Sequence, residues 1–247
     1  MKKKKVIVFL PAYNSAKTLA KTVGLIPRGS YDELLLVDDG SKDNTVSIAK
    51  KLKITTVSLP HNVGYGGNQK IGYFECLRHG ADVVMVLHPD AQYDPSRVGA
   101  MVKPILEGKA DVVLGSRFLP SWREAVRGGM PVYKIFFNRI LTMIQNFLFK
   151  TKFAETHTGC WAYSRKFLET VPFFRNVNGY VHGSQLLAQA VFFDFKIVEI
   201  PVFCQYHKEM SSANFSQSLV YGIGTVWAAL EGRMNKNGWI HSRIFSR

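Results

Sequence analysis

The sequence predicts an α/β fold with a mostly parallel central sheet and helices on both faces, and two patterns support this. In the first half, short apolar runs alternate with segments of helical periodicity; the runs are 6–10, 34–37, 54–59, 83–87 and 111–114. Strands that alternate with helices through short connections form parallel sheets with right-handed crossovers. The run 83–87 is apolar throughout, which is typical of a central strand covered on both faces. We therefore expect one layer of the nucleotide-binding type from the N-terminus to about Phe118.

Helices are expected after most of these runs, each preceded by a polar or glycine-containing turn. Apolar residues recur at helical spacing in 15–25, and again from a cap at Asp43 or Asn44 through Leu52. A further helix ends near Leu77. After the fourth run, Asp94-Pro95-Ser96 is a typical helix start, with an acidic cap and proline at the first helical position.

The alternation ends beyond Phe118, where amphipathic helices are expected. In 131–150 the aromatic and aliphatic residues share one helical stripe, and Arg139 in the middle argues against a bilayer span. This helix either packs on the core or lies on a membrane surface, and its aromatic and basic residues favour the membrane. Three more elements are predicted: a strand at 160–163, a helix at 184–193 and an edge strand at 196–205 interrupted by Pro201.

Charge and cysteine content limit the class of protein. The chain has 247 residues, a net charge of +14 and a pI near 9.7, which predicts an anionic partner such as nucleic acid, a phosphorylated ligand or an acidic membrane surface. Three widely spaced cysteines form neither a disulfide framework nor a zinc motif. The N-terminus is basic, but its apolar run is too short for a signal peptide, so we expect a cytoplasmic location.

The most informative stretch is the end of the fourth run, His88-Pro89-Asp90-Ala91-Gln92. Ligands of open α/β sheets bind beyond the carboxyl ends of the strands, so Asp90 and Gln92 are candidates for a binding or metal site. The alternative is a loop aspartate that only caps the following helix.

Five motifs in order resemble the family 2 glycosyltransferases, and the nearest branch resembles the dolichyl- and polyprenyl-phosphate sugar synthases. The motifs are Pro11-Ala12-Tyr13-Asn14, Val37-Asp38-Asp39-Gly40-Ser41, His88-Pro89-Asp90-Ala91-Gln92, Gly115-Ser116-Arg117 and Thr158-Gly159-Cys160-Trp161-Ala162-Tyr163. The resemblance implies a GT-A type nucleotide-sugar-binding fold over 1–210, with a donor half (1–118), an acceptor half (119–210) and a helical tail (211–247). A membrane-surface or partner-binding helix is expected around 221–230.

The resemblance also implies roles for individual residues. Pro11 and Tyr13 would flank the base, Asp39 would accept hydrogen bonds from base or ribose, and Arg117 would face a phosphate. Asp90 would ligate a divalent metal, Mg²⁺ or Mn²⁺, with Gln92 beside it. Such a metal needs few protein oxygens because it keeps waters and phosphate oxygens, and an arginine fork matches phosphate geometry. The full expected donor site consists of Pro11, Ala12, Tyr13, Asn14, Val37, Asp39, Asn62, Gly66, His88, Pro89, Asp90 and Arg117.

Two departures from the family pattern matter. His88 stands where the family commonly has the first carboxylate of D-x-D, so either it shifts selectivity toward Mn²⁺, or Asp90, Gln92, pyrophosphate and water complete the shell, which we favour. His88 could equally be a packing residue.

The second departure is the absence of an acid at the start of the late helix. A hydroxyl acceptor needs a base, whereas a phosphate monoester arrives anionic, so Gln185 in place of an acid favours a lipid-phosphate acceptor. Arg127 and Lys208 are candidates to hold it. His182 as a base for a hydroxyl acceptor stays open.

The glycine cluster 64–67 follows the third strand and lacks dinucleotide-binding spacing. It either lets the backbone approach the donor, with Asn62 positioned by the turn, or forms a structural turn.

These observations predict an inverting glycosyltransferase, with Asp90, Arg117 and Gln185 in the catalytic site, that moves a sugar from a nucleoside-diphosphate-sugar to polyprenyl phosphate at the cytoplasmic membrane face. It would bind the membrane peripherally, with or without a membrane-anchoring partner. The alternatives are transfer to a saccharide hydroxyl and a non-catalytic nucleotide-sugar-binding subunit. Nucleic-acid binding is disfavoured because the aromatic residues form helical stripes rather than a stacking platform.

Overall fold

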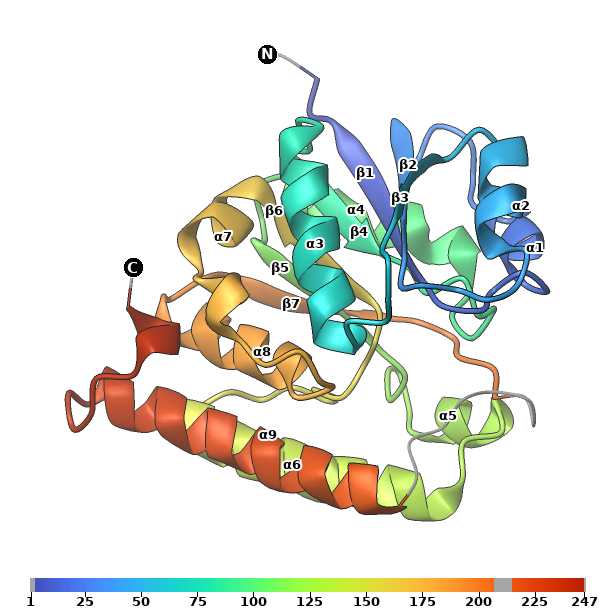
Figure 1. The fold of residues 1–247 in the computed structure, drawn as a ribbon. Helices are drawn as coiled ribbons and strands as arrows, with labels where there is room; N and C mark the ends of the chain where they lie inside the picture. The colour runs from blue at the N-terminus through green and yellow to red at the C-terminus, as the bar shows by residue number, and fades with distance from the viewer. Residues whose placement is uncertain (1–2, 207–214, 247) are drawn as a thin grey trace.

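The computed structural model describes residues 3–206 and 215–246, and the strands in these ranges form one seven-stranded sheet (Figure 1). The strand order is β3-β2-β1-β4-β6-β5-β7, and β6 runs antiparallel to both of its neighbours. The strands are β1 (Val6–Ala12), β2 (Glu33–Asp38), β3 (Thr55–Ser58), β4 (Val83–Val86), β5 (Val112–Ser116), β6 (Trp161–Ser164) and β7 (Ile197–Pro201). The predicted α/β class with a mostly parallel sheet is confirmed.

Most helices lie close to the positions that were predicted for them after the strands. They are α1 (Leu19–Gly24), α2 (Thr45–Lys51), α3 (Tyr65–Arg78), α4 (Val98–Leu106), α5 (Arg123–Arg127), α6 (Val132–Phe149), α7 (Arg165–Thr170), α8 (His182–Phe192) and α9 (Phe215–Lys236), with 3-10 turns at Pro95–Arg97, Phe173–Arg175 and Arg243–Phe245. The helix expected over 15–25 begins only at Leu19, because the Ser15 carbonyl accepts the amides of Thr18 and Leu19 in a preceding turn.

Both faces of the central strands are buried, as the continuous apolar runs predict. In β1, Phe9 packs into the cluster that includes Tyr73 of α3, and Val8 packs into the cluster on the other face with Met101 of α4. Phe9 lies so close to α3 that a Cβ on Gly72 would meet its ring at 2.1 Å. The sheet and the helices packed on its two faces therefore form a three-layer frame, which carries the loops at the carboxyl edge of the sheet.

Strands from the second half of the chain complete the same sheet. β6 is inserted between β4 and β5, and β7 is the edge strand beside β5 and ends at Pro201. Residues 3–118 and 119–206 consequently share one sheet and contribute to the same two clusters on its faces. The segment 215–236 is one long helix, α9, which packs on α8 and α6.

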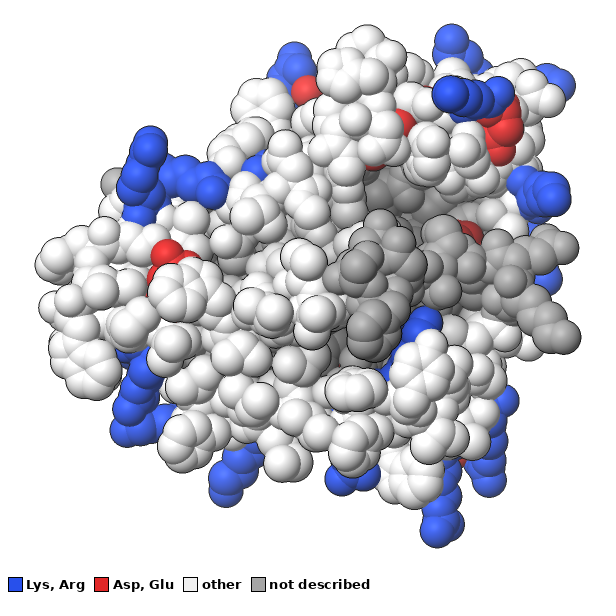
Figure 2. All heavy atoms as spheres, turned by 60° about the horizontal axis from the view of Figure 1, so that its bottom comes forward, with Lys and Arg blue, Asp and Glu red and all other residues white. Residues whose placement is uncertain are grey.

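Helices α6 and α9 lie side by side as a separate layer at the bottom of Figure 1. Their outward residues form what we call the α6–α9 face: Val132, Tyr133, Phe136, Phe137, Met143 and Phe147 of α6, and Leu219, Val220, Ile223 and Trp227 of α9, all exposed. Figure 2 brings this side forward and shows uncharged surface over much of it, with Lys and Arg side chains projecting around the edge. Among the described helices, none has both the length and the apolar character required to cross a bilayer.

Candidate active site

The loops after β1 and β2 hold each other in place at the carboxyl edge of the sheet. The amide of Asn14 donates to the Ser41 hydroxyl (2.8 Å), and the amide of Lys42 donates to Asn14 Oδ1 (2.9 Å). Asn14 has a positive φ of 49°, a conformation that asparagine tolerates better than most residues. Half-exposed Tyr13 is left at the surface of this pair of loops. Asn14 thus shapes the predicted donor loop through its contacts within the chain.

Asp39 is buried and orders the loop that precedes α3. Its Oδ1 accepts the amide of Val63 (2.8 Å), and burial raises the pKa of its carboxyl group. Asn62 caps the same turn by accepting the amide of Gly64 at 3.0 Å. The predicted base and ribose loops are therefore brought together, with Asp39 between them.

The remaining donor-loop residues lie beneath these side chains. Pro11 is partly buried, whereas Ala12 and Val37 are buried, and their carbonyls accept hydrogen bonds from the Asp39 amide (2.8 Å) and from Asn68 Nδ2 (3.0 Å), respectively.

The loop after β4 presents Asp90 on a tight turn. The amide of Gln92 donates to Asp90 Oδ1 (2.9 Å), and Ala91 between them has a positive φ of 59°. Pro89 is buried, and its carbonyl accepts the Thr18 hydroxyl at 2.5 Å. No described residue donates to the second carboxylate oxygen of Asp90, which leaves this oxygen for a ligand.

The cap of the following helical turn is Asp94. Its carboxylate accepts the amide and the hydroxyl of Ser96 at 2.9 and 2.8 Å, with Pro95 at the first helical position as predicted. Asp90 therefore has no capping role in this turn, and the capping interpretation of Asp90 is wrong.

His88 forms one wall of the site through aromatic stacking. Tyr65 stacks on it with ring centroids 5.6 Å apart and planes within 7°, and Tyr180 covers the other side of Tyr65 at 5.2 Å. Burial lowers the pKa of His88, although the nearby Asp90 charge opposes this. The His88 Nε2 atom is buried without a partner among the described residues. His88 is thus a neutral ring beside the metal-ligand candidate.

A divalent metal fits this loop only as a site completed by its ligand. Across residues 3–206 and 215–246, no group of three or more His, Cys, Asp or Glu side chains could hold a metal ion. Asp90 offers one uncommitted carboxylate oxygen and Gln92 an amide. Mg²⁺ and Mn²⁺ accept such a sparse protein set when phosphate oxygens and waters supply the rest.

Arg117 is placed differently from its predicted role. It is 6 % exposed, its amide and Nε donate to Glu155 (2.6 and 2.8 Å), and its Nη2 also bonds Glu155 and the His157 carbonyl. Nη1 donates to the Tyr206 hydroxyl at 2.5 Å. The guanidinium is largely committed to neighbours within the chain, so direct contact with phosphate stays a prediction.

The start of α8 contains buried side chains. Gln185 accepts the amide of Val177 (2.8 Å). His182 is fully buried with neither ring nitrogen hydrogen-bonded to a described residue, and burial together with the Lys70 charge lowers its pKa to about 3. A histidine with so low a pKa is a poor base for a hydroxyl acceptor. The structure therefore argues against His182 as that base.

Gly66 lies in close contact with another segment of the same chain. A Cβ there would lie 2.6 Å from the Val177 carbonyl oxygen and 2.8 Å from His182 Cβ, and the Gly66 amide donates to the Asn178 carbonyl (2.7 Å). This packing supports the structural alternative, and an approach of the Gly66 backbone to the donor stays a prediction.

The acceptor candidates are dispersed. Arg127 on α5 is exposed and paired with Glu124 at 2.7 Å. Lys208 lies outside the described residues.

Sequence reasoning missed several side chains around the site. Tyr65 lies inside the glycine cluster, and Glu155 lies three residues before the Thr158 motif. His157 shares a 2.8 Å hydrogen bond with Tyr221 of α9, and burial followed by the Arg117 charge lowers its pKa to about 3. Tyr221 and Asp90 both influence the pKa of Tyr65, which burial raises. Tyr65 and Glu155 could have been found because they lie in or beside motifs of the sequence. No local pattern indicated that Tyr221 lies near the site.

Solved structures share this fold. Glucosyl-3-phosphoglycerate synthase from Mycobacterium tuberculosis in complex with UDP matches with a TM-score of 0.70 and 19% identity, covering 97% of this chain and 82% of that one. The complex of the same enzyme with Mn²⁺, UDP and glucosyl-3-phosphoglycerate gives a TM-score of 0.67. The fold is therefore that of the GT-A glycosyltransferases.

The family follows from the sequence comparison. A family model described as glycosyl transferase family 2 matches residues 7–171, and the chain belongs to this family. It is 27% identical over 219 residues to UDP-N-acetylglucosamine–dolichyl-phosphate N-acetylglucosaminyltransferase of Methanococcus voltae, covering 82% of this chain and 86% of the relative. It is 26% identical over 204 residues to polyprenol monophosphomannose synthase of Mycolicibacterium smegmatis, covering 79% and 76%. The predicted resemblance to the polyprenyl-phosphate branch is confirmed.

Proposed function

We propose that this glycosyltransferase moves a sugar from a nucleoside-diphosphate-sugar onto a polyprenyl phosphate, with inversion, at the cytoplasmic face of a membrane. The names of the Methanococcus and Mycolicibacterium relatives support this acceptor class. The observation that carries the proposal is the lack of a suitable base near the site in the described part of the chain, apart from the metal-ligand candidate Asp90.

The carboxylates around the site, Asp90 excepted, accept hydrogen bonds from neighbouring groups of the chain. Glu155 bonds Arg117, Asp39 bonds the Val63 amide, and Glu199 of β7 accepts the amides of Ala154 and Glu155. The two buried histidines of this region have pKa values lowered to about 3. A hydroxyl acceptor must lose a proton as it attacks, and these groups are poorly suited to take it.

A phosphate acceptor needs no such base. Its oxygen attacks the anomeric carbon, the bond from that carbon to the donor pyrophosphate breaks, and the nucleoside diphosphate leaves with the electron pair. No proton has to be transferred because a phosphate monoester is already anionic near neutral pH. What the enzyme must supply is orientation and stabilisation of charge on the leaving group.

Asp90 and Gln92 are the residues we assign to a divalent metal, and Asp39 and Tyr13 to the donor nucleoside. A bound Mg²⁺ or Mn²⁺ would neutralise the leaving pyrophosphate. Asp90 would fix the metal through its uncommitted oxygen, while the Gln92 amide holds the carboxylate in position. Arg117 would act by holding the loop around His157 in position beneath the site.

The α6–α9 face would bring the enzyme to its lipid acceptor. Six exposed residues of α6 and four of α9 leave an apolar surface without a cover in the described chain. Such aromatic and aliphatic faces with basic margins are typical of helices that lie in the membrane interface. A membrane-anchoring partner on the same face would serve the same purpose.

The test is a transfer assay with purified protein, Mg²⁺ or Mn²⁺, and undecaprenyl or dolichyl phosphate in detergent. UDP-, GDP- and dTDP-sugars are compared, starting with UDP-sugars because the structural neighbours hold UDP. We expect a polyprenyl-phosphate sugar from one nucleotide class, detected by mass spectrometry.

A saccharide offered in place of the lipid gives the contrasting result. Product on the saccharide hydroxyl alone would overturn the acceptor assignment. Donor binding in a thermal-shift assay, with neither transfer nor donor hydrolysis, would indicate a non-catalytic subunit.

A further inference from the structure

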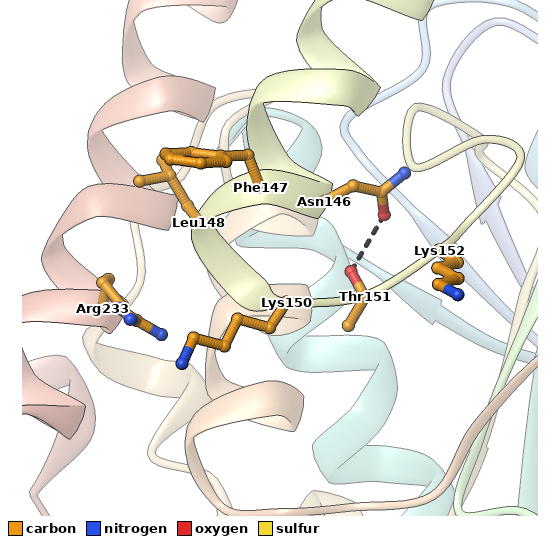
Figure 3. A pocket seen from close by; sticks show the side chains of 7 residues that line it. All are labelled: Asn146, Phe147, Leu148, Lys150, Thr151, Lys152 and Arg233. Carbon is orange, nitrogen blue, oxygen red and sulfur yellow. Dashed lines mark hydrogen bonds between the residues drawn. The ribbon is translucent and has the colours of Figure 1, made fainter.

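A cavity that is lined by none of the candidate active-site residues lies at the C-terminal ends of α6 and α9. It has a volume of about 440 Å³, within the range of small-molecule sites. Its lining residues are Asn146, Phe147, Leu148, Lys150, Thr151, Lys152 and Arg233 (Figure 3). Three of these seven side chains are cationic and none is acidic.

Lys150 and Arg233 of this cavity have no counter-charge among the described residues. Arg127, Arg165 and Lys236 each pair with a carboxylate within 2.7 Å. No described residue forms an ion pair or hydrogen bond with the side chains of Lys150 or Arg233. Figure 3 shows these two side chains pointing toward one another. Two like charges that converge without a carboxylate between them define a site for an anion.

The backbone that carries Lys150 is held firmly. Lys150 has a positive φ of 58°, and its amide and that of Thr151 donate to the Asn146 carbonyl. The Asn146 side chain accepts the Phe153 amide and the Thr151 hydroxyl, both at 2.9 Å, and donates to the Phe153 carbonyl at 2.8 Å. The backbone from which the Lys150 side chain projects is therefore ordered before any ligand binds.

The partial negative charge at a helix C-terminus attracts cations, but the two helix ends here do not neutralise the positive charge of the cavity. Each C-terminus is equivalent to roughly half a negative charge. An adjoining cavity of about 330 Å³ shares Lys150 and Arg233 and adds Lys236, whose partner is Asp194. Two helix ends and one aspartate oppose four lysine and arginine charges, so a net positive potential remains.

The apolar wall of the cavity identifies the kind of anion. Phe147, which is 82% exposed, and Leu148 continue the α6–α9 face into the cavity. A free phosphate would use the cations and leave Phe147 in water, whereas an amphiphile would use both.

We infer that the Lys150–Arg233 cleft binds the phosphate of an anionic phospholipid while its acyl chains cover Phe147 and the α6–α9 face. This inference rests on the proposed function only in that both place the α6–α9 face on a membrane. The lipid would orient the enzyme rather than take part in sugar transfer.

The first experiment measures partition of the full chain onto vesicles of phosphatidylcholine with 30% phosphatidylglycerol, compared with phosphatidylcholine alone. A basic residue near an anionic bilayer contributes about fivefold in affinity, so the variant Lys150→Gln/Arg233→Gln is expected to bind the anionic vesicles roughly 25-fold more weakly. The matched control, Lys17→Gln/Lys51→Gln, removes two exposed cations near α1 and α2 and is expected to change binding less than twofold. Equal losses in both variants would overturn the site, because they indicate an effect of net charge alone.

The second experiment uses soluble ligands and distinguishes the sources of phosphate. Dihexanoyl phosphatidylglycerol below its micelle concentration is expected to raise the melting temperature of the native chain and not of Lys150→Gln/Arg233→Gln. An equal shift with inorganic phosphate, or no shift with either, would overturn the lipid assignment.

Transfer to detergent-solubilised polyprenyl phosphate is measured on the same variants and should be unchanged. Failure of transfer in the native chain counts against the proposed function, and failure of the vesicle and lipid tests counts against this cleft.

Discussion

The carboxyl edge of the sheet and the α6–α9 face differ in whether their side chains are hydrogen-bonded within the chain or left exposed. At the sheet edge, Asp39, Asn14 and Asn62 are hydrogen-bonded to neighbouring loops, and one oxygen of Asp90 is left for a ligand. On the α6–α9 face, large apolar side chains are exposed from Val132 to Phe147 of α6 and from Leu219 to Trp227 of α9. A few uncommitted polar atoms on a rigid frame suit a small charged ligand, whereas a broad apolar surface suits a membrane or a protein partner.

The difference shows that the two ends of the proposed reaction have separate physical requirements. Donor binding needs preorganised polar groups, which explains the many hydrogen bonds between loops. Approach to a membrane surface needs apolar area and cations, and the exposed Phe147 and the unpaired Lys150 supply both at the end of the α6–α9 face. The predictions below test this contrast, from the largest expected effect to the smallest.

Removing the buried carboxylate beneath the sheet edge is expected to have the largest effect. Glu155 is fully buried and bonds Arg117 through three donors. Glu155→Ala leaves an unpaired buried guanidinium, which costs about 3–5 kcal/mol of unfolding free energy in urea titrations. Glu124→Ala breaks the exposed pair with Arg127 and is expected to cost at most about 1 kcal/mol. Equal costs would mean that the Arg117 pair is not part of the rigid frame.

Neutralising the metal-ligand candidate should abolish most activity without affecting stability. Asp90→Asn removes the charge that would hold the metal on the leaving pyrophosphate, and a loss of about 10²–10³-fold in kcat is expected, as for removal of one group that stabilises developing charge. Asp94→Asn in the same loop keeps a residue able to cap and should retain activity. Similar kinetics for both variants would exclude the assignment of Asp90.

Membrane binding should depend on the α6–α9 face and not on other exposed aromatic residues. Phe147→Ser removes a side chain worth about 1.5–3 kcal/mol on full burial, so vesicle binding is expected to weaken about tenfold or more. Phe74→Ser on α3 changes an exposed phenylalanine outside this face and should leave binding unaltered. If the two variants lose binding equally, the face has no special role.

Acid should destabilise the folded enzyme through its buried histidines. The pKa of His182 is lowered to about 3 by burial and by Lys70, whereas the unfolded chain has a value near 6.5. Between these values the unfolded state takes up a proton that the folded state does not, so stability falls as the pH falls below about 6.5, with a slope of about 1.4 kcal/mol per pH unit for each such histidine.

The measurement is the free energy of unfolding at several pH values between 6.5 and 5. His182→Leu should reduce the slope by one proton, while His61→Leu, which replaces an exposed histidine, serves as the control. An unchanged slope in His182→Leu would show that this histidine is not held neutral.

Local patterns were sufficient to predict the strands and most of the helices, whereas α5 and α7 were not predicted. Strand runs, caps and turn residues act over a few positions, so Asp94 as a cap, the strand before Asp90 and the amphipathic helix over 131–150 could all be predicted. The motifs also placed Asp39 and Asp90 at the same edge of the sheet, since the carboxyl ends of parallel strands meet there.

The partners of individual side chains could not be predicted in the same way. Arg117 was expected to face a phosphate, but its partner Glu155 is 38 positions along the chain. Gly66 was expected to approach a donor, but the 177–178 segment occupies that space. Insertion of β6 between β4 and β5 also depends on pairing between distant strands.

The sequence by itself determined the family, the α/β class and the edge of the sheet that carries the site, because periodicity and contiguous motifs are local properties. The tertiary structure alone decided which charges are neutralised and which are left uncovered. Burial and pairing depend on residues that are far apart in the chain, and they turned Arg117 and His182 inward while leaving Lys150 and Arg233 facing each other at the end of an apolar face.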